Sequence, residues 1–213
     1  MKTVIFAPHP DDEIIGCGGY AIKMIKDNNE VSVVYLKTPD NPSKNEIEQV
    51  KHYVGFHNIF FLNAGEGRYF QKSKELIQKI LDIIREMDPN TVLYPHENEQ
   101  DQDHKFMQDI VSECTFLCNS GFMLKQGQKK VSIDNLLGYE VWTPIQKPSL
   151  YVDITDHIID KTKAMEKYKS QKTIRDFTDM FKGLNRYRGV TSGVGDFAEA
   201  FEVYKIKNLT GEK

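Results

Sequence analysis

The sequence of 213 residues lacks the features that mark several specialised classes of protein. Its net charge is only −3, which gives no reason to expect nucleic acid or an anionic membrane as a partner. No apolar run is long enough to span a bilayer, and no secretory signal peptide precedes the first expected strand. We therefore expect a cytoplasmic protein that acts on a small molecule.

Cysteine is also scarce: there are three, an odd number, at positions 17, 114 and 118. A disulfide framework is not expected, because cytoplasmic thiols stay reduced. Cys114 and Cys118 are one helical turn apart, but no second pair of ligands lies near them in the sequence to complete a zinc site. We interpret all three as buried packing residues.

The remaining composition, 39% hydrophobic and 28% charged, is typical of an ordinary globular protein. The length predicts a single domain over residues 1–213, and there is no internal repeat or low-complexity segment. The sequence leaves the oligomeric state open, and a homo-oligomer is compatible with it.

Expected strands and helices alternate along the chain. The strands are expected at 2–7, 31–36, 58–62 and 91–94, and the helices at 14–26, 43–54, 73–87 and 105–118. Loops are expected at 38–43 and 63–69. This alternation predicts an α/β fold with three Rossmann-like layers, a mostly parallel sheet with helices on both faces. Further on we expect strands at 132–141 and 149–153, a helix at 155–168, and ordered loops at 185–189 and 193–196.

A charged cluster follows the first expected strand, in the order His9-Pro10-Asp11-Asp12-Glu13. The two prolines at positions 8 and 10 end the strand, because neither has an N–H for a sheet ladder. The cluster therefore lies at the carboxyl end of a strand, where open α/β sheets hold their ligands. Three adjacent carboxylates repel one another, and a dication is the simplest group that would hold them together.

A second polar cluster, residues 95–104, follows the fourth expected strand and ends at His104. Because the carboxyl ends of parallel strands lie on one edge of a sheet, the two clusters can meet. His9, Asp12 and His104 would then supply two nitrogens and one oxygen to a single metal. Two histidines and one carboxylate, with one position open to water, form a common catalytic zinc arrangement and also suit iron(II).

These residues resemble a known family, the LmbE-like (PIG-L) deacetylases. The resemblance rests on the first cluster followed by a glycine-containing helix, and on later segments. The later segments are Asp103-His104, residues 138–144 and residues 161–171. It implies a metal-dependent enzyme that removes acetyl groups from N-acetylated sugars of the N-acetylglucosamine type. It also implies that His9, Asp12 and His104 bind the metal, with zinc the first expectation, and that Asp11 is the general base.

Two positions depart from the family pattern. Asp101 stands where the family usually has a histidine that helps to stabilise the oxyanion, and an ionised carboxylate would repel an oxyanion. Either the metal alone stabilises it, or His96 reaches in, or the enzyme is weak or uses another substrate. Ser43 stands where the family often has a substrate-binding arginine, so substrate recognition is expected to differ.

Two other classes of function remain as alternatives. Gly16-Cys17-Gly18-Gly19-Tyr20-Ala21 fits the glycine pattern of dinucleotide sites, but it begins inside the expected helix rather than directly after the strand. We interpret these glycines as residues that let the helix approach the sheet closely. The second alternative is a relative of the family that binds metal without catalysis.

Several polar residues outside the two motifs have ordinary structural interpretations. We interpret His96 as a solvated loop residue, Trp142 as part of the core or of a pocket wall, and residues 161–172 as a solvated helix face. Arg186 and Arg188 are candidates for a polar rim of the site, but we interpret them as surface residues.

Overall fold

A mostly parallel sheet forms the centre of the molecule. The computed structural model describes residues 1–36, 43–64, 70–173 and 175–207. Over these residues the strands form one seven-stranded sheet in the order β3-β2-β1-β4-β5-β7-β6. The strands from β1 to β5 run parallel, and β7 is antiparallel to both β5 and β6. Their bounds are β1 Lys2–Ala7, β2 Glu30–Tyr35, β3 Ile59–Phe61, β4 Thr91–Pro95, β5 Asn135–Tyr139, β6 Leu150–Asp153 and β7 Ala198–Lys205.

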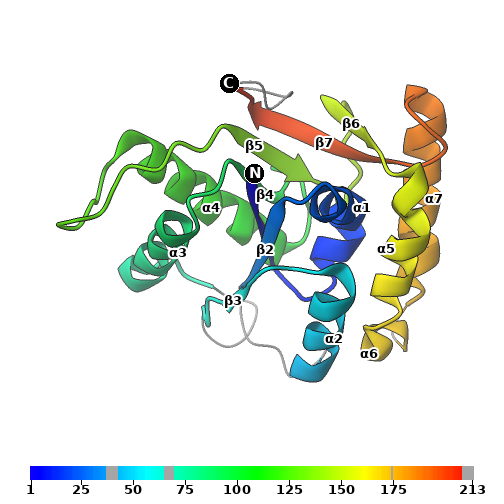
Figure 1. Cartoon of the computed structure of the whole chain (residues 1–213), viewed down its shortest axis with the longest axis horizontal. Coiled ribbons are helices and arrows are strands. Elements are labelled where there is room, and N and C mark those ends of the chain that lie inside the picture. Colours follow the sequence, from blue (N-terminus) through cyan, green and yellow to red (C-terminus); the bar gives the residue numbers. More distant parts are fainter. Residues whose placement is uncertain (37–42, 65–69, 174, 208–213) are drawn as a thin grey trace.

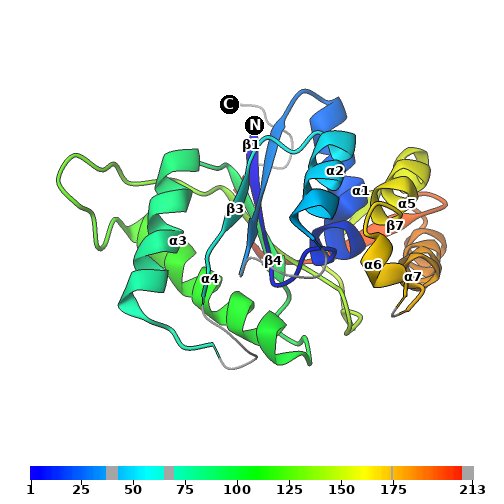
Figure 2. The ribbon, with the colours of Figure 1, turned by 90° about the horizontal axis from the view of Figure 1, so that it is seen from below.

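Helices cover both faces of this sheet, which completes the three layers expected from the sequence. Figure 2 shows α3 and α4 on one side of the strands and α1, α2, α5 and α7 on the other. The bounds are α1 Asp12–Lys26, α2 Lys44–Val54, α3 Lys74–Met87, α4 Gln102–Ser120, α5 Ile158–Met165, α6 Lys169–Lys172 and α7 Phe177–Ser192, with a 3₁₀ turn at Thr155–His157. Among the described residues, no helix is long and apolar enough to cross a membrane.

Strand β1 shows how the sequence builds two cores. Successive side chains of a strand point to opposite faces, and all of those from Val4 to Ala7 are buried. Val4 and Phe6 join the core beneath α3 and α4, whereas Ile5 and Ala7 join the core beneath α1 and α2. A continuous apolar run is therefore what a central strand with helices on both faces requires.

Local signals in the sequence set both ends of helix α2, as predicted. Ser43 caps α2 by accepting a hydrogen bond from the Glu46 amide, and the Glu46 carboxylate accepts one from the Ser43 amide in return. Gly55 ends the same helix in the left-handed region at φ 90°, a conformation that costs glycine least.

The glycines of α1 serve close packing, as interpreted from the sequence. A Cβ at Gly16 would overlap the Tyr139 ring, and one at Gly19 would lie 2.7 Å from the Ile154 side chain. Both positions lie inside the helix, where it packs against later parts of the chain, rather than at its N-terminus. This placement does not favour the dinucleotide-binding alternative.

The C-terminal third differs from the prediction in three elements: helix α7 and strand β7 are not among the predicted ones, and helix α5 is shorter than predicted. Residues 185–189 belong to helix α7 instead of a loop, whereas residues 193–196 follow the helix as a loop. Gly189 does not break α7, because it faces the backbone of Asp196, and a Cβ there would lie 2.6 Å from the Asp196 carbonyl carbon. The predicted helix at 155–168 is shorter, ending at Met165. Of the loops predicted at 38–43 and 63–69, residues 38–42 and 65–69 lie outside the described residues.

Candidate metal centre

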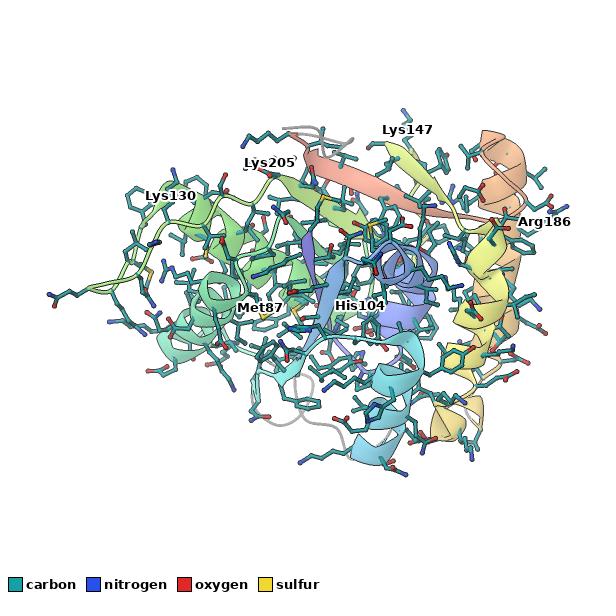
Figure 3. All side chains as sticks on the ribbon, in the orientation of Figure 1. Met87, His104, Lys130, Lys147, Arg186 and Lys205 are labelled. Atoms are coloured by element: carbon teal, nitrogen blue, oxygen red, sulfur yellow. The ribbon has the colours of Figure 1, made fainter. Side chains whose placement is uncertain are left out.

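The two sequence clusters meet at the point where the sheet changes winding direction. Strands β1 and β4 are neighbours, but β1 leads into α1 on one face and β4 leads towards α4 on the other. Ligand sites of open α/β sheets form at such switch points, outside the carboxyl ends of the strands. His9 and Asp12 follow β1, and His104 lies in the first turn of α4, near the centre of the molecule (Figure 3).

The three predicted ligands converge. The Nδ1 atom of His9 lies 3.3 Å from Oδ2 of Asp12, and Nε2 of His104 lies 3.2 Å from the same oxygen. One donor atom from each of the three residues lies within 4.8 Å of the others. His104 is fully buried and Asp12 nearly so, but the His9 side chain is 36% exposed, which leaves the cluster open to solvent on that side.

This donor set fits a small dication. Ligand atoms about 2.0–2.1 Å from a tetrahedral zinc ion are roughly 3.3 Å apart, which matches the two distances to Asp12 Oδ2. Both ring nitrogens of His104 are buried without a hydrogen-bond partner, which is costly for polar atoms unless something else satisfies them. Nε2 of His9 is 2.9 Å from Oδ2 of Asp103, so a carboxylate lies on the far side of that imidazole.

The electrostatic environment of the cluster favours the charged forms of His9 and Asp12. Burial opposes the charged form of His9, but hydrogen bonds with Asp103 and Asp12 raise its pKa to about 10. Burial also opposes ionisation of Asp12, yet the imidazoles of His104 and His9 hold its pKa well below the usual range. A cation bound here would displace the imidazole protons, since only neutral imidazole is a ligand.

Asp11 stands beside the cluster with a strained backbone. Its φ is 127°, a value that residues with a side chain rarely adopt. Burial, followed by repulsion from Asp12 and Glu13, raises the pKa of Asp11 well above its ordinary value. The Asp11 amide donates to Oε2 of Glu13 at 3.0 Å. The other Glu13 oxygen accepts from the Tyr168 hydroxyl at 2.7 Å, so the strained turn is tied to the C-terminal third of the chain.

With this geometry established, comparison with known proteins identifies the family. The model of the PIG-L family, described as GlcNAc-PI de-N-acetylase, matches residues 4–115, which are 112 of the 213 residues. The chain belongs to the PIG-L family. The matched segment contains both clusters and ends within helix α4.

The proteins similar to this PIG-L protein carry names that describe different activities. A glucosamine-6-phosphate deaminase-like protein of Bacteroides thetaiotaomicron is 35% identical over 83 residues, which cover 38% of this chain but only 12% of that protein. Among solved structures, N,N'-diacetylchitobiose deacetylase from Pyrococcus horikoshii is 24% identical with a TM-score of 0.80, covering 98% of this chain and 87% of that one. The 4-carboxy-2-hydroxymuconate hydratase GalB from Pseudomonas putida KT2440 is 17% identical with a TM-score of 0.84, covering 100% of both chains. At these identities the structural likeness establishes the fold.

Asp101, where this PIG-L protein departs from the family pattern, has a structural role. One of its carboxylate oxygens accepts hydrogen bonds from the amides of Asp103 at 2.9 Å and His104 at 3.4 Å. Asp101 is therefore the N-cap of α4, the helix whose first turn carries His104. The Asp101 carboxylate, which would repel an oxyanion, thus stabilises helix α4, and this helix positions the predicted ligand His104.

The interpretation of His96 as a solvated loop residue is wrong. The side chain is buried, its Nε2 lies 2.7 Å from the Thr143 carbonyl oxygen, and its Nδ1 accepts from the Asn98 amide at 3.3 Å. Both ring nitrogens are thus engaged with backbone groups. His96 is not free to donate to a substrate from this position.

Two other surface interpretations are also corrected. Lys161 is fully buried, and its Nζ lies 2.7 Å from a Glu199 carboxylate oxygen, so this part of residues 161–172 is not a solvated face. Arg188 is buried and holds Glu140 through two hydrogen bonds of 3.1 and 2.8 Å. Arg186 is exposed, as interpreted, and pairs with Asp196 at the edge of the molecule (Figure 3). Sequence carried no local signal for the buried pairs, because their partners are distant in the chain.

Trp142 is more exposed than the core interpretation predicts. The residue is 41% exposed, and its ring packs edge-on against Phe177 at the start of α7. The guanidinium of Arg175 lies 5.9 Å from the centre of the same ring. The three predicted thiols, in contrast, are free and buried.

One buried carboxylate at the site, that of Glu99, is not predicted from the sequence. Its side chain is fully buried, and Oε2 lies 3.9 Å from Nδ1 of His104. The position is one of several acidic residues in the polar segment after β4, and nothing local distinguishes it from its exposed neighbour Glu97.

Proposed function

We propose that this protein is a metal-dependent hydrolase that removes the acetyl group from the amide of a small N-acetylated sugar or sugar conjugate. N-acetylglucosamine-type compounds are the first candidates, and the cytoplasm is the predicted compartment. The observation that carries the proposal is the convergence of His9, Asp12 and His104 beside the strained Asp11. Membership of the PIG-L family, whose model is described as a de-N-acetylase, supports it.

His9, Asp12 and His104 would hold one divalent metal, with zinc the first candidate and iron(II) the second. When bound, a dication at this position would lower the pKa of a bound water, polarise the amide carbonyl and stabilise the charge that develops on its oxygen. Neutral imidazole and ionised carboxylate are the forms that bind it, so the proposed centre requires both histidines to be deprotonated.

Asp11 is the proposed general base. It is adjacent in sequence to the ligand Asp12 and 7% exposed, so its carboxylate is largely shielded from water. In this role it takes a proton from the attacking water and passes it to the leaving amine. The hydrogen bond from the Asp11 amide to Glu13 restrains the backbone from which that carboxylate projects.

Neither side chain considered for the oxyanion is free to donate a hydrogen to it. Both ring nitrogens of His96 are engaged with backbone groups, and Asp101 caps helix α4. The bound metal alone would therefore stabilise the oxyanion. In that case the aspartate at position 101, in place of the family's histidine, would not by itself abolish activity.

The test measures metal content and amide hydrolysis on the same preparations. Elemental analysis of tag-free protein should find about one zinc or iron per chain, and the double variant Asp12→Ala, His104→Ala should have lost it. In a screen of N-acetyl sugars, the parent protein should release free amine and the double variant should not. His52→Ala, at an exposed histidine of α2, is the matched control and should behave like the parent.

Two other outcomes would overturn the proposal in favour of the alternatives. Stoichiometric metal without release of acetate from any N-acetyl sugar would indicate a metal-binding relative without catalysis. Absence of metal after reconstitution with zinc and with iron, together with binding of NAD or NADP, would indicate a dinucleotide-binding protein.

A further inference from the structure

Two buried polar atoms face each other across a short gap behind the proposed metal centre. Nδ1 of His104 and Oε2 of Glu99 are 3.9 Å apart, and neither has a hydrogen-bond partner. Both side chains are fully buried. Unpartnered buried polar atoms are rare because each costs free energy, so two that face each other call for a common explanation.

The backbone after β5 fixes the position of Glu99. Its other oxygen, Oε1, accepts hydrogen bonds from three successive amides, those of residues 141, 142 and 143, at 2.8, 2.9 and 3.3 Å. Three convergent amides form a concave anion site. They fix one carboxylate oxygen and leave the other, Oε2, pointing towards His104.

The opposite side of the His104 ring faces the ligand cluster. Nε2 lies 3.2 Å from Oδ2 of Asp12. The ring therefore lies between a carboxylate that belongs to the proposed centre and one that lies behind it. In a neutral imidazole, only the nitrogen without a proton can bind a metal. A carboxylate that accepts a hydrogen bond from the other nitrogen fixes the proton there.

His9 shows the same arrangement within the same site. Its Nδ1 faces Asp12 at 3.3 Å, and its Nε2 is 2.9 Å from Asp103. Each imidazole thus has one nitrogen towards Asp12 and the other towards an acidic side chain that does not belong to the ligand cluster. The two differ in distance, since the His9 pair is already within hydrogen-bond range.

We propose that Glu99 is the positioning residue of His104. It holds this imidazole as the tautomer protonated on Nδ1, so that Nε2 is free to bind the divalent cation. The 3.9 Å gap closes to a hydrogen bond when the ring turns towards a bound cation. This inference rests on the proposed metal-dependent function, and it extends the site to the backbone at 141–143.

The variant that tests it is Glu99→Gln, which keeps the size of the side chain. Its carbonyl oxygen can still accept from the three amides, but its NH₂ group would then face Nδ1 of His104 and favour the other tautomer. The matched control is Glu97→Gln, the same change two residues away on an exposed side chain. Zinc affinity is measured by competition with a fluorescent chelator. We expect Glu99→Gln to weaken zinc binding about 10- to 100-fold and Glu97→Gln to leave it unchanged.

A second measurement uses the parent protein and does not depend on a variant that folds. Nitrogen-15 NMR of the histidine rings in the zinc-loaded protein should show His104 protonated on Nδ1 and metal-bound through Nε2. Metal on Nδ1 would overturn the inference, and so would equally tight zinc binding by the parent and Glu99→Gln, although either result would leave the metal centre standing. A parent protein that binds no zinc and no iron would overturn the inference and the proposed function together.

Discussion

The backbone of Asp11 shows the cost of placing a carboxylate beside two others. A residue with a Cβ at φ 127° stores strain of order 1–3 kcal/mol. Such strain persists only where the surroundings hold it, and here the buried Glu13 carboxylate accepts the Asp11 amide hydrogen. Strain of this kind is typical of functional sites, which agrees with the proposed role of Asp11.

Comparison of Asp11→Gly with Asp11→Ala separates the strain from the carboxylate. Both variants lack the proposed base, so both should lose hydrolysis by about 10²- to 10⁴-fold. Only glycine relieves the strain, and we expect Asp11→Gly to be more stable than Asp11→Ala by about 1 kcal/mol. Urea unfolding of the two variants checks this. Equal stability would show that the backbone is not strained in solution, and retained activity would exclude Asp11 as the base.

Substitutions of Asp101 can likewise distinguish the effect of its negative charge from its effect as the N-cap of α4. Asparagine caps a helix as well as aspartate does, whereas alanine costs about 1 kcal/mol. We therefore expect Asp101→Asn to keep the parent stability and to match or exceed its kcat, because the variant removes a negative charge near the oxyanion. Asp101→Ala should unfold more easily, by about that amount. If kcat of Asp101→Asn instead fell to the level of Asp11→Ala, Asp101 would itself be a catalytic group.

Helix α1 depends on a buried ion pair from the other end of the chain. The helix is kinked at Cys17, whose φ of −146° is not helical. On either side of this residue, Lys161 donates to the Ile15 carbonyl oxygen and Glu199 accepts from the Gly19 amide, at 2.8 and 2.7 Å. The pair thus connects the backbone before the kink with the backbone after it. The segment before the kink carries Asp12, so the pair supports the site at a distance.

Substitution of Lys161 measures how much the kinked helix depends on this pair. Lys161→Met leaves the Glu199 charge buried without its cation, and we expect a loss of about 3–5 kcal/mol. The matched control is Lys26→Met, because Lys26 also joins α1 to α5, through Asp160, but with 53% of its side chain exposed. It should cost about 1 kcal/mol or less. Thermal and urea unfolding provide the comparison, and equal losses in the two variants would contradict the assignment.

These contacts also show which parts of the structure the sequence could predict. The caps of α2 and the apolar stripe of α3 are local patterns, and the helices lie where those patterns place them. The convergence of His9 with His104 followed from the alternation of strands and helices, because parallel strands align their carboxyl ends. The buried partner of Lys161 could not be predicted, since Glu199 is 38 residues away and belongs to an antiparallel strand. Helix α7 was missed because Gly189, which suggests a loop, is needed there for contact with Asp196.

The distribution of the cores bears on whether the chain is one domain, as its length predicts. The family model ends at residue 115, yet the core beneath α1 contains residues from β5, α5, α7 and β7. Strand β5 pairs with β4 on one side and with β7 on the other. In Figure 1 the strands labelled β5 and β7 continue the sheet beyond β4, and α5 lies next to α1 and α2. The core beneath α1 is therefore built from both halves of the chain.

Calorimetry with and without zinc tests in one experiment whether the chain unfolds as a single unit and whether the folded protein binds metal. Because the core is shared, we expect one unfolding transition whose calorimetric and van't Hoff enthalpies agree. The proposed ligands come from the β1–α1 turn and from α4, so the site exists only when these elements are packed together and the metal binds the folded state. Free zinc at 100 times its Kd then adds about 2.7 kcal/mol, which for a chain of this length raises Tm by roughly 5–10 °C. The variant His104→Ala should show the single transition without the shift. Two transitions in the parent, of which zinc moves only one, would instead mean that the metal-binding part unfolds independently of the C-terminal third.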